Sequence, residues 1–373
     1  MKLSASLLRI AFGSLSCASA QTARLMEEHG ITLEEFFRIK DRELMQMLGA
    51  GASVAASLYD RESALAEAKE EEEFVERHSI RTLFFSDDDY PFRLRECSDA
   101  PPLLFMLGNV DLNSDHILSI VGTRRPTTYG VRFCEQLVEH TSPTADDLLT
   151  VSGLAYGIDA SVHQASLANN VPTVAVVAHG LDMIYPAAHR GLAQQIVHNG
   201  GAILSEYHRG VKPFRGHFLE RNRIIAGLSD ATVVAESAIK GGAMSTANMA
   251  FSYNREVFAV PGRIGDEQSS GCNHLIKIGK AHIATCADDI ADTMGWTGPA
   301  SRKEPLQRHI FPELEPEQRP VCELLRRATS PLTIDEIHAE LRVPVAQLLA
   351  ILGELEFDGV VARLPGNRYE AAL

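Results

Sequence analysis

The chain has 373 residues, 45% of them hydrophobic and 23% charged, and carries a formal net charge of −14. This length predicts two or three domains of ordinary globular composition, and the acidic balance argues against non-specific coating of duplex DNA. Six cysteines without a CxxC pair or a zinc spacing, and no apolar run of about 18 residues, predict a cytoplasmic protein with reduced thiols, no metal or cofactor and no membrane span.

Residues 1–75 are predicted to form a small helical domain. The first twenty residues loosely resemble a secretory signal, but Arg9 interrupts their apolar stretch, so we predict a helix there instead. Gly13, Gly30 and Gly49 divide the region as C-caps or turns. The other helices predicted here cover residues 20–29, 33–39, 41–48 and 53–66.

Residues 76–297 show alternation between short apolar runs and segments of helical length. This pattern predicts a Rossmann-like, doubly wound, mostly parallel sheet covered by helices on both faces. The predicted strands are 117–121, 148–151, 173–177, 202–205, 231–235 and 257–260. The predicted helices are 129–140, 159–169, 189–198, 220–228 and 244–254.

Residues 312–373 are predicted to form a winged-helix domain, because three helices precede a short hairpin. The helices are expected at 316–328, 333–341 and 344–358, and the hairpin strands at 360–364 and 369–371. The segment 344–358 has the place of a recognition helix but contains no Lys or Arg. We therefore expect this domain to contact protein rather than grip duplex DNA.

Glycines follow most of the predicted strands, as in Gly122-Thr123-Arg124, Ser152-Gly153 and Gly241-Gly242. Ligands of open α/β sheets bind beyond the carboxyl ends of the strands, where backbone N–H groups and helix N-termini attract anions. For any one of these loops taken alone, a glycine that merely allows a tight turn is the better explanation. Five such loops at one sheet edge nevertheless favour a phosphate-binding rim.

The segment 209–223 is strongly basic within an otherwise acidic chain. It contains five cations and one acid, Glu220, with Phe214 and Phe218 between them. Cations attract phosphates and aromatic rings stack on unpaired bases, so the segment favours a site for single-stranded nucleic acid. A solvated helix start with two core phenylalanines is equally compatible with this segment taken alone.

Motifs for common enzyme classes are missing. There is no GxxxxGK[ST] loop, no GxGxxG after the first strand and no acidic pair with a nearby His. One enzyme hypothesis stays open, that of a Rossmann-like nucleotide-binding enzyme related to nucleoside-monophosphate phosphoribohydrolases, in which Glu236 acts as an acid or base. A scaffold for partner proteins is a third possibility, but it leaves the basic segment unexplained.

Several stretches, in this order, resemble the DNA-processing protein A family, DprA or Smf. They are SGLAYGID at 152–159, GLDMIYP at 180–186, FLERNRIIAGLS at 218–229 and GCNHLIKIG at 271–279. The resemblance covers the whole central domain, and the flanking regions look like the family's SAM or helix-hairpin-helix module and its winged helix.

The resemblance implies a non-enzymatic recombination mediator that binds single-stranded DNA, protects incoming DNA and loads the RecA recombinase in natural transformation. It also implies a homodimer formed through the central domain. Arg124 is expected to contact a phosphate, and one of the two phenylalanines is expected to stack on a base. The family usually has Ser-Gly where this chain has Gly241-Gly242, which leaves the contact of Ser245 open. The implied DNA-binding residues are Gly122, Thr123, Arg124, Ser152, Gly153, Lys212, Phe214, Phe218, Arg221, Asn222, Arg223, Gly242 and Ser245.

Overall fold

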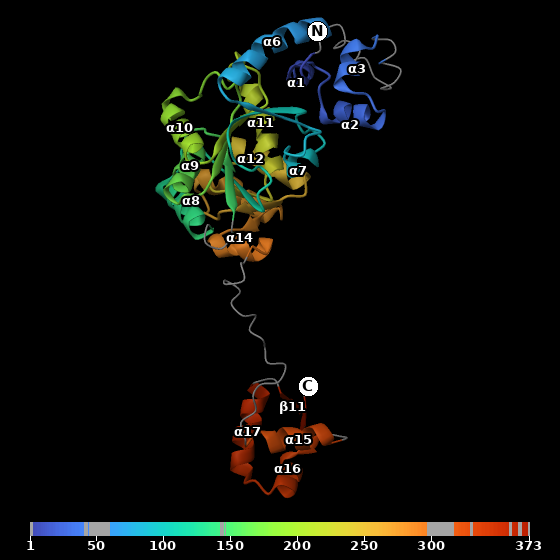
Figure 1. Ribbon diagram of the computed structural model, residues 1–373. Helices are drawn as coiled ribbons and strands as arrows, with labels where there is room; N and C mark the ends of the chain where they lie inside the picture. Colours follow the sequence, from blue (N-terminus) through green and yellow to red (C-terminus); the bar gives the residue numbers. More distant parts are fainter. Residues whose placement is uncertain are drawn as a thin grey trace. The chain divides into compact units, whose positions relative to one another are not determined.

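The structure, a computed structural model, forms two compact units, Met1–Gly298 and Pro299–Leu373 (Figure 1). We refer to them as the sheet unit and the C-terminal unit. The helices predicted for residues 1–75 share the sheet unit, so the domain boundary near residue 75 stays a prediction. The residues described are 3–40, 44, 60–141, 145, 147–296, 317–328, 331–357, 360–364 and 368–371.

A nine-stranded sheet organises the sheet unit, in the order β1-β2-β6-β5-β4-β3-β7-β8-β9. The seven strands from β6 to β9 in this order are parallel, whereas β2 is antiparallel to both β6 and β1. The strands are β1 Arg81–Phe84, β2 Leu103–Gly108, β3 His116–Val121, β4 Leu148–Ser152, β5 Thr173–Val176, β6 Ala202–Ser205, β7 Ala231–Val234, β8 Glu256–Ala259 and β9 His282–Ile283. All six predicted strands are confirmed. Strands β1, β2 and β9 were not predicted; they lie at the sheet's two edges and outside the βα alternation.

Both faces of the sheet are covered, which confirms the doubly wound class. Successive residues of β3 alternate between two cores: Ile117 and Val121 pack on the side of α11 and α12, and Leu118 and Ile120 on the side of α8 and α9. Figure 1 shows α8, α9 and α10 on one side of the sheet and α7, α11 and α12 on the other. The helices are α7 Phe92–Arg95, α8 Thr128–Thr141, α9 Ile158–Ala168, α10 Arg190–His198, α11 Arg215–Leu228, α12 Gly242–Ser252, α13 Ser270–Lys277 and α14 Ala287–Met294.

The N-terminal helices pack against the antiparallel edge of the sheet through a shared aromatic core. The ring of Phe12 lies 5.2 Å from that of Phe36 and 6.0 Å from that of Phe84, measured between centroids. The helices are α1 Ala5–Gly13, α2 Ala20–Glu28, α3 Leu33–Arg38 and α6 Arg61–Arg77. The predicted helix 41–48 lies outside the described residues, apart from Leu44.

Helix α6 continues eleven residues beyond the predicted end at residue 66. The run of glutamates that follows residue 66 does not interrupt the helix, because acids on the exposed face of a helix are compatible with it. Its inner face is formed by Ala64, Ala68, Glu71 and Val75, which are buried at helical spacing. Residues 53–59 of the predicted helix lie outside the described part of the chain.

The C-terminal unit has the expected winged-helix arrangement. Helices α15 Arg319–Arg327, α16 Ile334–Leu341 and α17 Val345–Phe357 pack on a small antiparallel sheet of order β10-β12-β11. The third strand, β10 Leu332–Thr333, was not predicted; the other two are β11 Val361–Leu364 and β12 Arg368–Ala371. Leu348, Leu352 and Tyr369 lie in its core. No helix in the described part of either unit is long and apolar enough to cross a membrane.

Candidate nucleic-acid interface

A cleft of about 830 Å³ lies beyond the carboxyl ends of β3 and β7. These neighbouring strands mark the point at which the strand order reverses, where open α/β sheets hold their ligands. The loop Gly122–Arg125 and the loop Ser237–Gly242 line the cleft together with one face of α11 and the first turns of α12. The glycine loops of the first and fifth predicted strands are therefore brought together, as expected.

The cleft is strongly cationic. Five basic side chains and one acid, Asp159, line it. Four of the five are exposed, and none of these four forms an ion pair with another described residue. Exposed cations without internal partners are the groups that attract phosphates. The four are Arg124, Arg125, Arg215 and Lys240.

One face of α11 forms a wall of the cleft. The helix begins at Arg215, one and a half turns before the predicted start at residue 220. Residues three or four positions apart share a helical face, and the residues of α11 that line the cleft include Arg215, Phe218, Leu219, Asn222 and Ile225. This spacing brings a cation, a ring and an amide from the basic segment to the same cleft.

Phe218, not Phe214, is the phenylalanine that lines the cleft. The guanidinium carbon of Arg124 lies 5.3 Å from the centroid of the Phe218 ring, and the ring of Tyr185 lies 5.9 Å from it. Phe214 is 67% exposed and does not line the cleft. Phe218 and Tyr185 therefore offer adjacent aromatic surfaces beside the exposed guanidinium of Arg124.

Tyr185 lines the cleft but was not part of the implied site, and the same is true of the cations Arg125, Arg215 and Lys240. Two of these residues lie in stretches that the sequence had already singled out: Tyr185 in GLDMIYP at 180–186 and Arg215 in the basic segment 209–223. The backbone N–H of Tyr185 donates to Nε2 of His179 at 3.1 Å, while Nδ1 of His179 contacts the Gly180 carbonyl at 2.9 Å. Burial lowers the pKa of His179, so its ring stays neutral and its Nε2 is available as an acceptor.

Arg221 lies under the cleft rather than at its rim. Its Nη1 donates to the carbonyl oxygens of Gly153, at 2.8 Å, and of Val176. Burial lowers the pKa of Arg221 to about 10, so the side chain remains a cation at neutral pH. It faces Asp159, whose pKa is raised by burial and lowered by Arg221. Arg221 is therefore a structural cation of the cleft floor.

Ser152 and Gly153 support this floor and do not line the cleft. The Ser152 hydroxyl donates to the Ile120 carbonyl at 2.7 Å and is fully buried. A Cβ atom at position 153 would overlap the guanidinium of Arg221. The Ser152 hydroxyl and the Gly153 carbonyl are thus engaged within the fold, and the direct DNA contacts implied for these two residues stay a prediction.

Lys212 and Arg223 also lie outside the cleft lining. Arg223 pairs with Glu206 and donates to the Asp99 carbonyl at 2.7 Å, so its charge is neutralised within the fold. It follows Asn222 directly, and one residue of a helix turns by about 100°, which directs Arg223 away from the cleft. Arg209 is likewise occupied, because it pairs with Glu70 and Glu71 of α6.

Gly242 and Ser245 line the cleft at the start of α12. The N-terminus of a helix attracts anions through its free N–H groups and its dipole. Gly242 is exposed, and no neighbouring atom lies within 4 Å of a Cβ built on it. The Gly-Gly sequence at this position therefore leaves the helix N-terminus open to the cleft.

Gly157 holds the cleft loops together, and its replacement is expected to destabilise them. Its φ of 84° lies in the region that favours glycine, and a Cβ there would overlap the backbone of Thr123 and Arg124. Gly157→Ala is expected to lower the stability of the sheet unit by about 1–3 kcal/mol, measured by urea unfolding. Gly210→Ala is the matched control, because Gly210 also has a positive φ, of 81°, but has open space around a Cβ. If both variants lost the same free energy of unfolding, backbone strain alone, and not the overlap with the Thr123–Arg124 loop, would account for the destabilisation.

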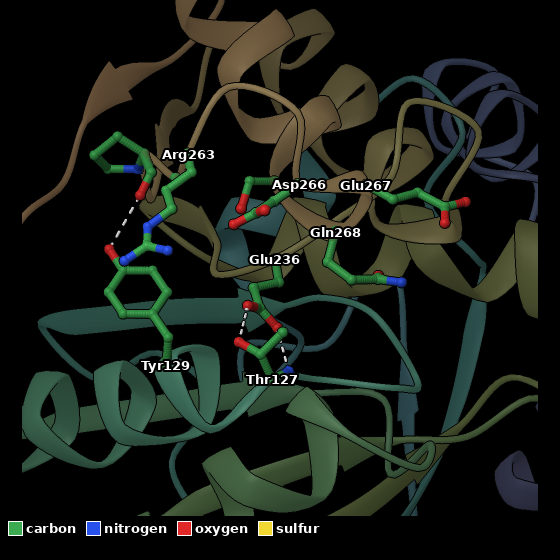
Figure 2. Close-up of a pocket in the computed structure, with 10 residues that line it drawn as sticks. Thr127, Tyr129, Glu236, Arg263, Asp266, Glu267 and Gln268 are labelled. Carbon is green, nitrogen blue, oxygen red and sulfur yellow. Dashed lines mark hydrogen bonds between the residues drawn. The ribbon is translucent and has the colours of Figure 1, made fainter.

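A second pocket, of about 820 Å³, adjoins the cleft and contains Glu236 (Figure 2). The carboxylate of Glu236 is buried and accepts from the N–H of Thr127 at 2.8 Å and from its hydroxyl at 2.5 Å. Gly130 provides the room for this carboxylate. Both oxygens are thus engaged in holding the start of α8, which gives Glu236 a structural role.

A family model described as DNA recombination-mediator protein A matches residues 81–295, and one described as DprA winged helix domain matches residues 307–367. The chain is 37% identical over 276 residues to the DNA processing protein DprA of Streptococcus pneumoniae, covering 71% of this chain and 94% of the relative. It is 35% identical over 283 residues to the protein Smf of Escherichia coli, covering 74% of each.

Two solved structures share the fold. The X-ray structure of Streptococcus pneumoniae DNA processing protein A matches with a TM-score of 0.63 and 32% identity, covering 78% of this chain and 98% of that chain. The Helicobacter pylori DNA processing protein A, whose structure concerns its single-stranded DNA binding mode, matches with a TM-score of 0.52 and 30% identity, covering 58% of this chain and 95% of that chain.

Proposed function

This chain belongs to the DNA recombination-mediator protein A (DprA/Smf) family, and from this premise we propose that it binds single-stranded DNA in the cleft beside α11. The proposal rests on one combination in a single cleft. Four exposed cations that form no ion pair with any described residue lie there together with the rings of Phe218 and Tyr185. Phosphates bind the cations, and unpaired bases stack on the rings. An unpaired strand is the polyanion that offers both features.

The proposal extends to the biological role. The bound strand is incoming DNA, which the protein protects and passes to the RecA recombinase during natural transformation, acting in the cytoplasm as a homodimer of the central domain. Family membership supports this role. No covalent chemistry is required of the protein, because a mediator acts by binding and presenting the strand.

An enzymatic function related to nucleotide phosphoribohydrolases is not favoured. That hypothesis needs Glu236 as an acid or base, and both of its carboxylate oxygens are bonded to Thr127. A general acid or base needs access to the substrate.

Binding is expected to depend steeply on salt. Four cations that neutralise four phosphates give a slope of about −3 for log affinity against log salt on a single strand. The affinity for a labelled 20-residue oligothymidine should therefore fall about 50-fold between 50 and 200 mM NaCl, measured by fluorescence anisotropy. A duplex of the same length should bind more weakly. A slope of log affinity against log salt near zero, or an equal affinity for the duplex, would contradict the proposed function.

A further inference from the structure

Asn222 is a buried amide without a partner. Its side chain is only 9% exposed, yet it lines the cleft, and no described residue forms a hydrogen bond with its amide group. Thr246, on α12, shares these properties: it is 2% exposed, lines the cleft, and its hydroxyl has no hydrogen bond with any described residue. Two elements of the fold thus bring unsatisfied polar groups to one cleft.

Buried polar groups are normally hydrogen-bonded, because burial without a partner costs free energy. Their atoms are not sealed in the interior, since neither is among the polar atoms that are fully enclosed without a partner. The missing partner therefore comes from the cleft, in the form of water in the free protein and of ligand in the complex.

The position of Asn222 selects the part of the strand that it contacts. The cations suited to phosphates are exposed at the rim, whereas Asn222 lies at the buried end of the α11 face. Phe218 and Ile225, four residues before it and three after it, line the cleft on either side along the helix. Apolar flanks around an amide suit a flat base whose polar edge meets the amide.

We propose that Asn222, assisted by Thr246, binds the Watson–Crick edge of one unpaired base; this rests on the proposed function. A carboxamide presents a donor beside an acceptor. Each of the four bases presents the complementary pair on its Watson–Crick edge, and the amide can turn over to match either order. The contact therefore requires a base without choosing its identity.

The same contact excludes duplex DNA. In a duplex the Watson–Crick edges are occupied by the opposite strand, so Asn222 would remain without a partner. Rejection of a ligand that leaves a buried polar group unpaired is a strong form of specificity. Asn222 thus distinguishes single strands from duplexes in a way that the phosphate contacts alone do not.

The test compares oligothymidine with an oligomer of N3-methylthymidine of equal length, which keeps the ring and the phosphates but blocks the Watson–Crick edge. The full-length protein is titrated with both by fluorescence anisotropy. Asn222→Ala is expected to weaken oligothymidine binding about tenfold and to change binding of the methylated oligomer by less than about twofold. Thr246→Val should show the same pattern with a smaller loss, and it provides an independent reading if Asn222→Ala does not fold.

Asn248→Ala is the matched control. Asn248 is an exposed amide of α12 outside the cleft lining, where it bonds the Met244 carbonyl and Lys280, and its loss should affect neither oligomer. Equal weakening of both oligomers by Asn222→Ala, or no weakening of either, would overturn the assignment of Asn222. Failure of the wild-type protein to bind oligothymidine at all would instead overturn the proposed function.

Discussion

Arg124→Ala is expected to weaken binding of oligothymidine by about 1.5–3 kcal/mol, or roughly 10- to 100-fold. Arg124 is exposed, has no acidic partner among the described residues, and lies over the ring of Phe218. Its removal takes away a charged hydrogen bond to phosphate and also the cation that accompanies the stacking ring. Fluorescence anisotropy should show a salt slope shallower by about 0.7. Combining it with Arg215→Ala should deepen both effects, because the two cations line the same cleft.

Lys212→Ala is the matched control for Arg124→Ala. Lys212 belongs to the same basic segment and is exposed, but it does not line the cleft. Its removal should change the affinity by less than about twofold, since an exposed charge outside the contact is screened by salt. A loss as large as that of Arg124→Ala would mean that the strand follows the surface of the basic segment and not the cleft.

Arg221→Ala is expected to destabilise the sheet unit by about 3–5 kcal/mol. The substitution leaves the carbonyl oxygens of Gly153 and Val176 without their donor and removes the buried cation that faces Asp159. Buried groups that lose their partner keep the cost of burial without its compensation. Urea unfolding followed by the fluorescence of the single tryptophan, the buried Trp296 of the sheet unit, measures the effect.

Arg125→Ala provides the comparison for Arg221→Ala. Arg125 lines the same cleft but is exposed and unpaired among the described residues, so its loss should change stability by less than about 0.5 kcal/mol. If Arg221→Ala unfolded at the same urea concentration as the wild-type protein while losing DNA binding, Arg221 would be a contact residue and not the floor of the cleft.

The sequence by itself determined the layered architecture. Short apolar, β-branched runs followed by helical segments identified all six strands of the predicted sheet. Parallel strands that are buried on both faces have nearly continuous apolar sequences, and this makes them recognisable. The glycine after the first strand and the Gly-Gly pair after the fifth also predicted loops on one sheet edge, since parallel strands end together there. The motifs at 152–159 and 218–229 indicate the family from the amino-acid sequence alone.

Only the tertiary structure decided which cations of the basic segment line the cleft. Because α11 begins at Arg215 and not at residue 220, Phe218 and Asn222 share one helical face that lines the cleft, whereas Arg223 lies outside the lining. The partners that neutralise Arg209 and Arg223 are Glu70, Glu71 and Glu206, of which two lie over 130 residues away along the chain. A count of charges along the sequence does not reveal which face of a helix a cation occupies. It also does not reveal which distant acidic residues pair with that cation, because these pairs form only when the chain folds.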